Sequence, residues 1–406
     1  MSAYINEITN TEVLTELLML TGQMLLENGA ETFRVETSVV NMFYALGGNG
    51  EINVVALGTQ MTLDTFDGEH HTAVRRIRRR GVNLEKFARI NDVVRKVSEG
   101  KLSADDALLL LRELDTAKIG NRAVQIFAAA MLVSGMFVFM IGGGLIEAAI
   151  AFICCLTVQT GWLFVKKSAS FVFVAHIFSG FLTAVIASLC VLIWGGNLER
   201  IIFGALLPLF PGVAMIIAIR DTFNGDLTSG VARGVEAVLA AVGLALGTTL
   251  GLMSIAFFGV AASSVPVETI SGLPYALFAM LVSFGSGFML SARLKTAVVG
   301  AVVGGIVYAV FLLCDSASAG VFIASLTLAL LSETSARIIK APSTLFLIIG
   351  IYPLVPGAGI YKTATLILQN NVTEALSTGN TTAAELLFLI AGIAIVSTLF
   401  KMKEAE

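Results

Sequence analysis

The chain has 406 residues, of which 56% are hydrophobic and 14% charged, and its mean hydropathy is +0.87. These values lie far outside the usual range of soluble domains, so the composition excludes a soluble protein and predicts a membrane protein. The charges are unevenly placed: residues 1–118 hold 17 acidic and 13 basic residues, and the other 288 residues hold 25 charges. We therefore expect a hydrophilic domain, 1–118, followed by a membrane body.

The hydrophilic domain shows four helical and three strand-like patterns, with Gly29 and Gly47 as helix stops. The helices are predicted at 11–30, 32–47, 83–98 and 103–114, and the strands at 52–57, 60–66 and 72–78. The domain is expected to be a small cytoplasmic α+β unit, because the first residues lack the basic flank and short apolar core of a cleavable signal. Its net charge of −4 argues against nucleic acid as a partner. The basic run 75–80 is either a solvated strand face or a contact to anionic membrane lipids.

The membrane body contains ten apolar segments of about 20 residues, the length that a spanning helix needs. They lie near 122–141, 144–165, 171–193, 201–219, 232–255, 273–291, 296–314, 319–336, 343–366 and 382–400. Lys and Arg gather in the connections on one side, and the positive-inside rule then places both termini in the cytoplasm. We expect the protein in the cell (plasma or inner) membrane.

The two halves of the membrane body repeat each other. AMLVSGMFVFM (130–140) and AMLVSFGSGFM (279–289) share seven of eleven positions at an offset of 149, and PLFPG (208–212) matches PLVPG (353–357) at 145. Glu236 corresponds to Glu385 in the second copy, again at an offset of 149 residues. Five spans in a copy is an odd number, so we predict an α-helical polytopic membrane protein with ten transmembrane helices in two inverted five-helix repeats, 119–258 and 259–406. Inverted repeats are typical of secondary transporters.

Proline interrupts the fourth and the ninth predicted span twice each. Proline has no N–H, and its ring clashes with the carbonyl four residues earlier, so each break releases backbone carbonyls, at Gly204 and Leu207 in the first case. A membrane interior tolerates such groups only beside protein or a wet cavity. The sequence therefore predicts substrate-binding residues at the two breaks, with structural kinks as the alternative: Pro208, Pro211, Gly212, Pro353, Pro356 and Gly357.

Ionisable residues within spans are candidates for proton coupling. Glu236 and Glu385 lie about one turn inside their spans, near opposite membrane faces, where each is able to bind a proton. The alternative is an interfacial carboxylate, with Glu236 paired to Arg233 one turn earlier. His176 is either a proton relay or a hydrogen-bonded packing residue.

The connection 220–233 is dense in polar residues and follows the first broken span. Its structural interpretation is a tight turn around Asn224 and Gly225, since Asn-Gly is a strong turn signal. Its functional interpretation is a cytoplasmic gate in which Arg220 and Asp221 pair. The candidate gate residues are Arg220, Asp221, Asn224, Asp226 and Arg233.

The sequence contains no nucleophile elbow, P-loop or HExxH motif. The four cysteines lie in apolar runs without metal-site or disulfide spacing. We therefore expect no enzyme activity, no cofactor and no bound metal.

Two stretches, NGAETFRVETSVVNMFYALG (28–47) and RDTFNGDLTSGVARGVEA (220–237), resemble motifs of the threonine/serine exporter (ThrE) family in its fused form. The resemblance implies proton-driven export of threonine and serine, or of dicarboxylates such as succinate in members split into two subunits. It carries over Gly29, Glu31, Arg34 and Glu36 without a known role, and in the second stretch Arg220, Asp221, Asn224, Gly225, Asp226, Arg233 and Glu236. The second half has QNNVTEALSTG (369–379) in place of the charged turn.

The resulting hypothesis is a proton-coupled exporter of an amino acid or another small carboxylate that works by alternating access. Its expected partners are the substrate, protons and membrane lipids. The rivals are a dicarboxylate exporter, a passive channel, and a membrane-bound enzyme with a hydrolase-like head. A head that docks a partner or holds a homo-oligomer together is a further alternative.

Overall fold

The computed structural model describes residues 2–66, 70–78, 81–164, 169–257, 272, 274–354 and 357–405. The chain forms two compact units. The first comprises residues 1–120 and 217–234, and the second comprises 121–216 and 235–406. A short segment from the middle of the sequence thus belongs to the amino-terminal unit.

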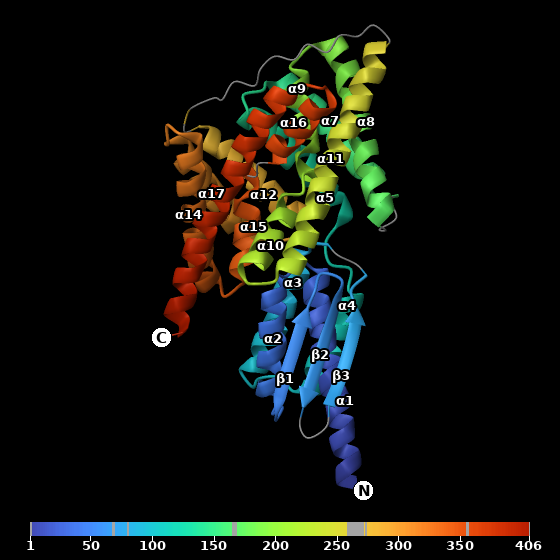
Figure 1. Cartoon of the computed structure of the whole chain (residues 1–406), viewed down its shortest axis with the longest axis vertical. Helices are drawn as coiled ribbons and strands as arrows, with labels where there is room; N and C mark the ends of the chain where they lie inside the picture. Colours follow the sequence, from blue (N-terminus) through green and yellow to red (C-terminus); the bar gives the residue numbers. More distant parts are fainter. Residues whose placement is uncertain are drawn as a thin grey trace. The chain divides into compact units, whose positions relative to one another are not determined.

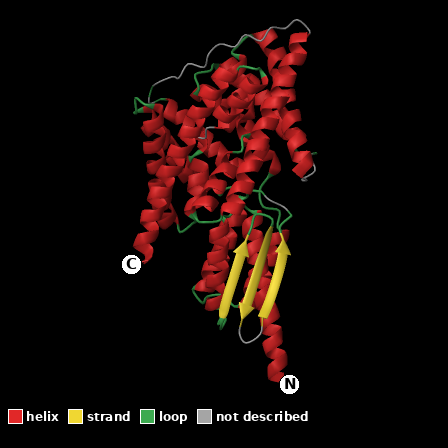
Figure 2. Cartoon of the chain, in the orientation of Figure 1, coloured by secondary structure: helices red, strands yellow, loops and turns green. Residues whose placement is uncertain are grey.

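The first unit is a three-stranded antiparallel sheet with helices on one side. Its elements are α1 (Ser2–Glu27), α2 (Thr32–Ala45), β1 (Glu51–Ala56), β2 (Gln60–Phe66), β3 (His70–Arg76), α3 (Leu84–Ser98) and α4 (Ala104–Thr116). The strands pair in the order β1-β2-β3, with Val54 opposite Leu63 and Leu63 opposite Ala73. Met61 and Leu63 alternate inward along β2 and are buried, and α1 and α2 lie behind the sheet in Figure 1. The predicted small α+β unit is confirmed (Figure 2).

The second unit is helical within the described residues. Its first half contains α5 (Arg122–Ala128), the π-helix η1 (Ala129–Gly135), α6 (Met136–Met140), α7 (Leu145–Gly161), α8 (Ala169–Trp194), α9 (Leu198–Leu206), the 3₁₀-helix η2 (Leu207–Leu209), α10 (Gly212–Phe223) and α11 (Leu227–Phe257). Its second half contains α12 (Tyr275–Met289), α13 (Leu294–Leu312), α14 (Ala317–Ile339), α15 (Ser343–Gly350), the 3₁₀-helix η3 (Tyr352–Leu354), α16 (Gly357–Leu368) and α17 (Val372–Ala405). Helix α10 ends in the first unit and α11 begins there, because residues 217–234 belong to that unit.

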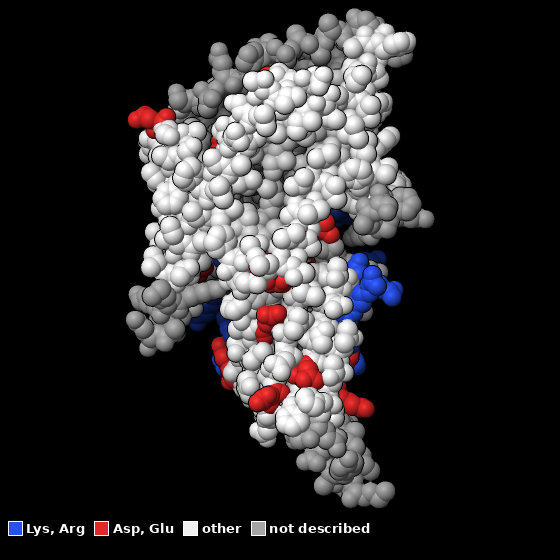
Figure 3. Space-filling model, viewed as in Figure 1, with Lys and Arg blue, Asp and Glu red and all other residues white. Residues whose placement is uncertain are grey.

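Six helices of the described chain are long and apolar enough to cross a membrane, or eight if each bent pair counts as one span. The bent pairs are α9–η2 with α10, at 53°, and α15 with η3–α16, at 45°. Helices α7 and α12 are apolar but shorter, with 17 and 15 residues. Large apolar side chains such as Phe178 and Ile193 are exposed on the second unit, and charges are sparse on its face in Figure 3. These features are those of an integral membrane protein, whereas ten spans and their inversion stay predictions.

The two halves of the second unit have matching elements. The first broken helix consists of pieces of 9, 3 and 12 residues, and the second of 8, 3 and 12. A Cβ atom on Gly243 would lie 3.2 Å from His176 Cβ, and one on Gly392 would lie 1.8 Å from Ser325 Oγ. Gly392 follows Gly243 by the offset of 149, and Ser325 follows His176 by the same offset. Helices α8 and α11 therefore pack as α14 and α17 do.

Candidate functional site

The amino terminus of α2 is completed by a residue from far along the chain. Gly29, at φ +96°, turns the chain after α1, and Glu31 precedes α2 in an extended conformation. The Asp221 carboxylate oxygen Oδ1 accepts hydrogen bonds from Thr32 N, at 3.0 Å, and from Thr32 Oγ1, at 3.1 Å. The first N–H groups of a helix have no partner within it, and a carboxylate both accepts from them and interacts favourably with the helix dipole. Asp221 therefore caps a helix 189 residues away.

Asp221 is part of a charge cluster made of Glu31, Arg34, Arg220, Asp221 and Arg233. Asp221 is fully buried, and its Oδ2 lies 3.1 Å from Arg233 Nε. Arg220 Nη1 pairs with Glu31 Oε1, and Arg34 Nε lies 3.8 Å from Glu31 Oε2. Burying a charge is costly unless it is paired, and here each buried carboxylate has a guanidinium partner. The charge cluster thus joins α2 to the segment 217–234 within the first unit.

The turn between α10 and α11 is a tight one, as the Asn-Gly signal predicts. Gly225 has φ +96°, and Asp226 N donates to Asp221 O at 2.9 Å. The Asn224 side chain donates to the Arg220 carbonyl at 2.8 Å. Asp226 Oδ1 accepts from Ser229 N at 3.0 Å, which is the bond of a helix N-cap.

A second set of contacts ties this turn to the sheet. Gly58 N, in the hairpin between β1 and β2, donates to Ser229 Oγ at 3.2 Å. On α2, Glu36 Oε1 accepts from Ala56 N at 2.9 Å. Burial raises the pKa of the Glu36 carboxyl, the bond from Ala56 lowers it, and the nearby Asp226 charge raises it further. The segment 217–234 is therefore held at both α2 and the hairpin.

Two ion pairs join Arg220 and Asp221 to other residues, whereas a gate formed by Arg220 with Asp221 stays a prediction. Adjacent residues on a helix point in different directions, so Arg220 meets Glu31 while Asp221 meets Arg233. Sequence reasoning gave Glu31 no role and did not single out Thr32, which is fully buried and donates twice to Asp221. The available signal for both residues was a polar pair that begins two residues after the Gly29 helix stop.

Both predicted helix breaks are present. Pro208 is the middle residue of η2, and Pro353 is the middle residue of η3. Pro211 follows η2, and α10 begins at the next residue, Gly212. In the second half α16 begins at Gly357. The predicted site residue Pro356 lies outside the described residues.

The carbonyls at the first break are satisfied inside the break. Gly204 O accepts from Leu207 N, and Leu207 O accepts from Phe210 N at 3.1 Å. These are bonds of the 3₁₀ type, which tighten a helix end and occupy carbonyls that an α-helix would leave free. The expected release of these two carbonyls is therefore compensated locally, as the kink interpretation requires.

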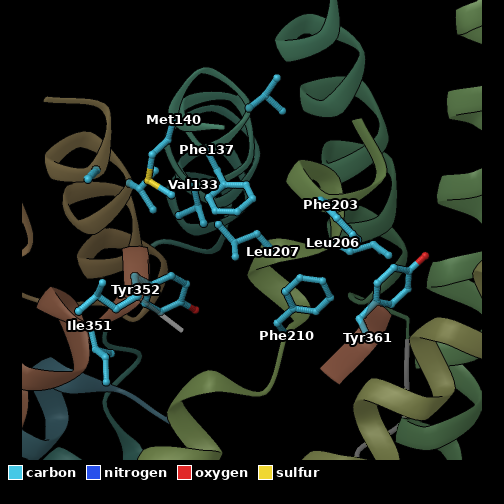
Figure 4. Close-up of a cluster of buried hydrophobic side chains, with 14 of the residues drawn as sticks. Val133, Phe137, Met140, Phe203, Leu206, Leu207, Phe210, Ile351, Tyr352 and Tyr361 are labelled. Atoms are coloured by element: carbon cyan, nitrogen blue, oxygen red, sulfur yellow. The ribbon is translucent and has the colours of Figure 1, made fainter. Parts of the chain in front are cut away.

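The two breaks lie in one buried cluster of side chains. Phe210, at the first break, has its ring centroid 5.8 Å from that of Tyr361 on α16, and Phe203 on α9 has its centroid 5.5 Å from the same ring. Figure 4 shows these side chains together with Ile351 and Tyr352 from the second break. Residues of both halves thus pack around the breaks, and substrate binding there stays a prediction.

The three ionisable candidates within the second unit differ in their surroundings. His176 is buried, with Nδ1 2.7 Å from Val172 O and its ring edge-to-face with Trp162 at 5.0 Å, as expected of a packing residue. Glu236 is exposed on α11, and Glu385 is partly buried on α17. A role for these two carboxyls in proton coupling stays a prediction.

Residues 16–255 match a family model described as "Putative threonine/serine exporter", and residues 275–399 match a second, "Threonine/Serine exporter, ThrE". A Corynebacterium glutamicum protein named "Threonine/serine exporter" is 23% identical over 323 residues, which are 74% of this chain and 66% of the relative. A Mycobacterium tuberculosis protein named "Probable threonine/serine exporter" is 20% identical over 326 residues, or 77% of this chain and 61% of the relative. The chain thus spans less than two thirds of the length of these relatives. No solved structure matches it.

Proposed function

Because the chain belongs to the threonine/serine exporter (ThrE) family, we propose that it is a secondary transporter that exports small amino acids, threonine and serine, from the cytoplasm. The names of the two relatives support this substrate class. The mechanism proposed is alternating access between two inverted five-span halves, with both termini in the cytoplasm.

The observation that carries the proposal is the pair of matched helix breaks. Each consists of a three-residue 3₁₀-helix with a central proline, Pro208 or Pro353, and each is followed by a helix of 12 residues. In secondary transporters, broken helices at the interface of two repeats form the substrate site. The ring contact between Phe210 and Tyr361 brings the two broken helices together, as such a site requires.

The repeated packing of α8 on α11 and of α14 on α17 supports two halves that move as similar bodies. Glu236 and Glu385 occupy equivalent places on α11 and α17, and we assign them the coupled proton. The charge cluster is assigned to gating, because it fixes the segment 217–234, which contains the end of the first broken helix and the turn after it.

The test is transport by the purified chain in proteoliposomes. Labelled threonine and labelled succinate are offered separately, with a pH gradient and with the gradient collapsed by a protonophore, and protein-free vesicles serve as the control. We expect saturable, gradient-dependent threonine flux that shows counterflow. Succinate flux in its place would make the protein a dicarboxylate exporter, flux without saturation or counterflow would make it a channel, and no flux of either compound would remove the proposal.

A further inference from the structure

Many serine and threonine hydroxyls in the described helices donate to a carbonyl about one turn earlier. Thr160 Oγ1 donates to Leu156 O at 2.7 Å, and Ser286 Oγ donates to Ser283 O at 2.7 Å. Six buried hydroxyls of the described chain have no hydrogen-bond partner among nitrogen and oxygen atoms: Ser134, Thr183, Ser188, Thr249, Ser283 and Ser332. A buried hydroxyl without a partner costs free energy, so each of the six calls for an explanation.

Four of these six residues are two repeat pairs. Ser283 follows Ser134 by the offset of 149, and Ser332 follows Thr183 by the same offset. All four are fully buried. Alanine at any of these positions would remove the cost of the buried hydroxyl, yet the hydroxyl is present in both copies. The repetition indicates a use for the hydroxyl that the helices themselves do not supply.

Ser134 and Ser283 lie where the first helices of the two halves cross. A Cβ atom on Gly285 of α12 would lie 2.4 Å from Leu132 Cβ and 3.1 Å from Val133 N of η1. The two serines are therefore within two residues of a close backbone contact between the repeats. Ser134 also lies in the π-helix η1, a local widening that is frequent at functional sites.

Each serine also lies beside a broken helix. A Cβ atom on Gly204, three residues before η2, would lie 3.2 Å from Ser134 O. A Cβ atom on Gly304 would lie 2.0 Å from Ser283 Oγ and 3.3 Å from the carbonyl oxygen of Gly350, the last residue of α15. The serines thus connect the crossing of the halves to the two breaks.

The immediate neighbours of the serines are repeat partners as well. Ser134 lies beside the thiol of Cys155, which is a weak hydrogen-bonding group. The residue related to Cys155 by the offset of 149 is Gly304, and this glycine leaves room for the Ser283 hydroxyl. Both copies therefore keep the serine in the same position relative to the second helix of the repeat.

The surroundings restrict the charge of a ligand. Among the described residues of the second unit, the buried carboxylate and basic side chains are Glu147 and His176. Glu147 accepts bonds from Gly144 N and Asn197 N, each at 2.6 Å, and His176 Nδ1 is 2.7 Å from Val172 O. A ligand with a net charge would lack a counter-ion at the crossing, whereas a zwitterion carries its own. A hydroxyl both donates and accepts, so it suits a carboxylate and an ammonium group equally.

We propose that Ser134 and Ser283 are the paired polar contacts of a ligand site at the crossing of η1 and α12, and that its ligand is a small α-amino acid without net charge. This inference rests on the proposed function and narrows it, since it excludes succinate as a ligand of this site.

The test uses S134A, S283A and the double variant of the full chain, with S286A as the matched control. Ser286 is a buried serine on the same helix as Ser283, but its hydroxyl is already bonded. Threonine, serine, glycine and succinate are added to the detergent-solubilised protein, and the shift in its unfolding temperature gives an apparent affinity. Counterflow in proteoliposomes then gives the KM for threonine.

We expect S134A and S283A each to weaken threonine binding about tenfold and to raise KM in proportion, and the double variant to weaken it further. The ligand-free unfolding temperature of these variants should be unchanged or higher, because an unsatisfied hydroxyl is removed. S286A should show the opposite pattern, with lower stability and unchanged affinity. Succinate should produce no shift.

The inference is overturned if the double variant binds threonine as the unaltered protein does, or if S134A and S283A lose stability as S286A does. Threonine transport that persists unchanged in the double variant would sink the site while the proposed function stands. If neutral amino acids stabilise the unaltered protein but not the double variant, and no transport is seen, the site stands and the proposed function is removed.

Discussion

The turns that follow the two broken helices share a backbone and differ in their side chains. In the first, Asp226 N donates to Asp221 O at 2.9 Å around Gly225, whose φ is +96°. In the second, Asn371 N donates to Leu366 O at 2.9 Å around Asn370, whose φ is +62°. The second turn follows the first by 145 positions, which is also the offset between the two proline motifs.

The helix that follows each turn is capped in the same manner. Asp226 Oδ1 accepts from Ser229 N at 3.0 Å, and Asn371 Oδ1 accepts from Glu374 N at 3.5 Å. The position of the fully buried Asp221, however, is taken by the apolar Leu366 in the second copy. The comparison teaches that the repeat preserves the path of the chain, while the ion pairs of the charge cluster were built onto one copy alone.

The largest effect is expected from giving the first turn the apolar residue of the second, by Asp221→Leu. The substitution uncaps α2 and leaves the buried Arg233 without its carboxylate, and breaking a buried pair costs about 3–5 kcal/mol. Hydrogen exchange of the α2 amides in the full chain should accelerate strongly. Asn371→Asp is the matched control and should be close to neutral, since Asn and Asp are equally good N-caps. Unchanged protection of α2 in Asp221→Leu would contradict the role of the cap.

A smaller effect is expected at the left-handed residue of each turn. A Cβ atom on Gly225 meets nothing within 4 Å, so the cost of Gly225→Ala is that of the backbone conformation, about 1 kcal/mol. Gly225→Asn should cost less, because Asn adopts this region more readily and occupies it in the second turn. Thermal unfolding of both variants measures the difference. Equal losses for Ala and Asn would show that the two turns do not share a conformation.

The smallest effect is expected from Asp226→Asn, which gives the first turn the type of N-cap residue found in the second, Asn371. The substitution should change how the stability of the protein depends on pH. The pKa of Glu36 is raised above 4.5 mainly by burial and also by the Asp226 charge. A carboxyl whose folded-state pKa is raised contributes stability that declines as pH rises from its unfolded value through the raised one. Asp226→Asn removes the like charge, so this decline should be smaller above pH 4.5 than in the unaltered protein.

Unfolding measured at a series of pH values checks this expectation, with Asn371→Asp again as the control in the second turn. A decline that is steeper in Asp226→Asn, or identical to that of the unaltered protein, would remove Asp226 from the environment of Glu36.

The secondary structure of the hydrophilic domain was predicted well, because the sequence patterns that mark its helices and strands are local. The strand pattern at 60–66 coincides with β2, and the predicted helix 83–98 starts within one residue of α3, where Asn83 provides the N-cap. The proline pairs likewise marked both breaks, since proline alters the helix directly at its own position. Helix α1 starts at Ser2, well before the predicted residue 11, because no strong start signal marks that end.

The charge cluster was not predictable in the same way. The sequence singled out Arg220 and Asp221 but paired them with each other, because nothing local shows that Glu31 lies nearby. Their actual partners depend on how a segment around residue 220 packs on α2, which is a property of the folded chain. It was equally impossible to predict that Ser134 and Ser283 lack a nitrogen or oxygen partner, since this is recognised only from the surroundings of the hydroxyl.

The cap on α2 also sets an order for biosynthesis. Ribosomes make the amino-terminal residues first, and a domain of continuous sequence is able to fold as soon as it emerges. This unit has to wait, because Asp221 and Arg233 are translated only after residues 121–216. The nascent unit therefore emerges with the Thr32 amide lacking its cap and with Glu31 lacking Arg220, and it completes its structure only when more than half of the polypeptide has been synthesised.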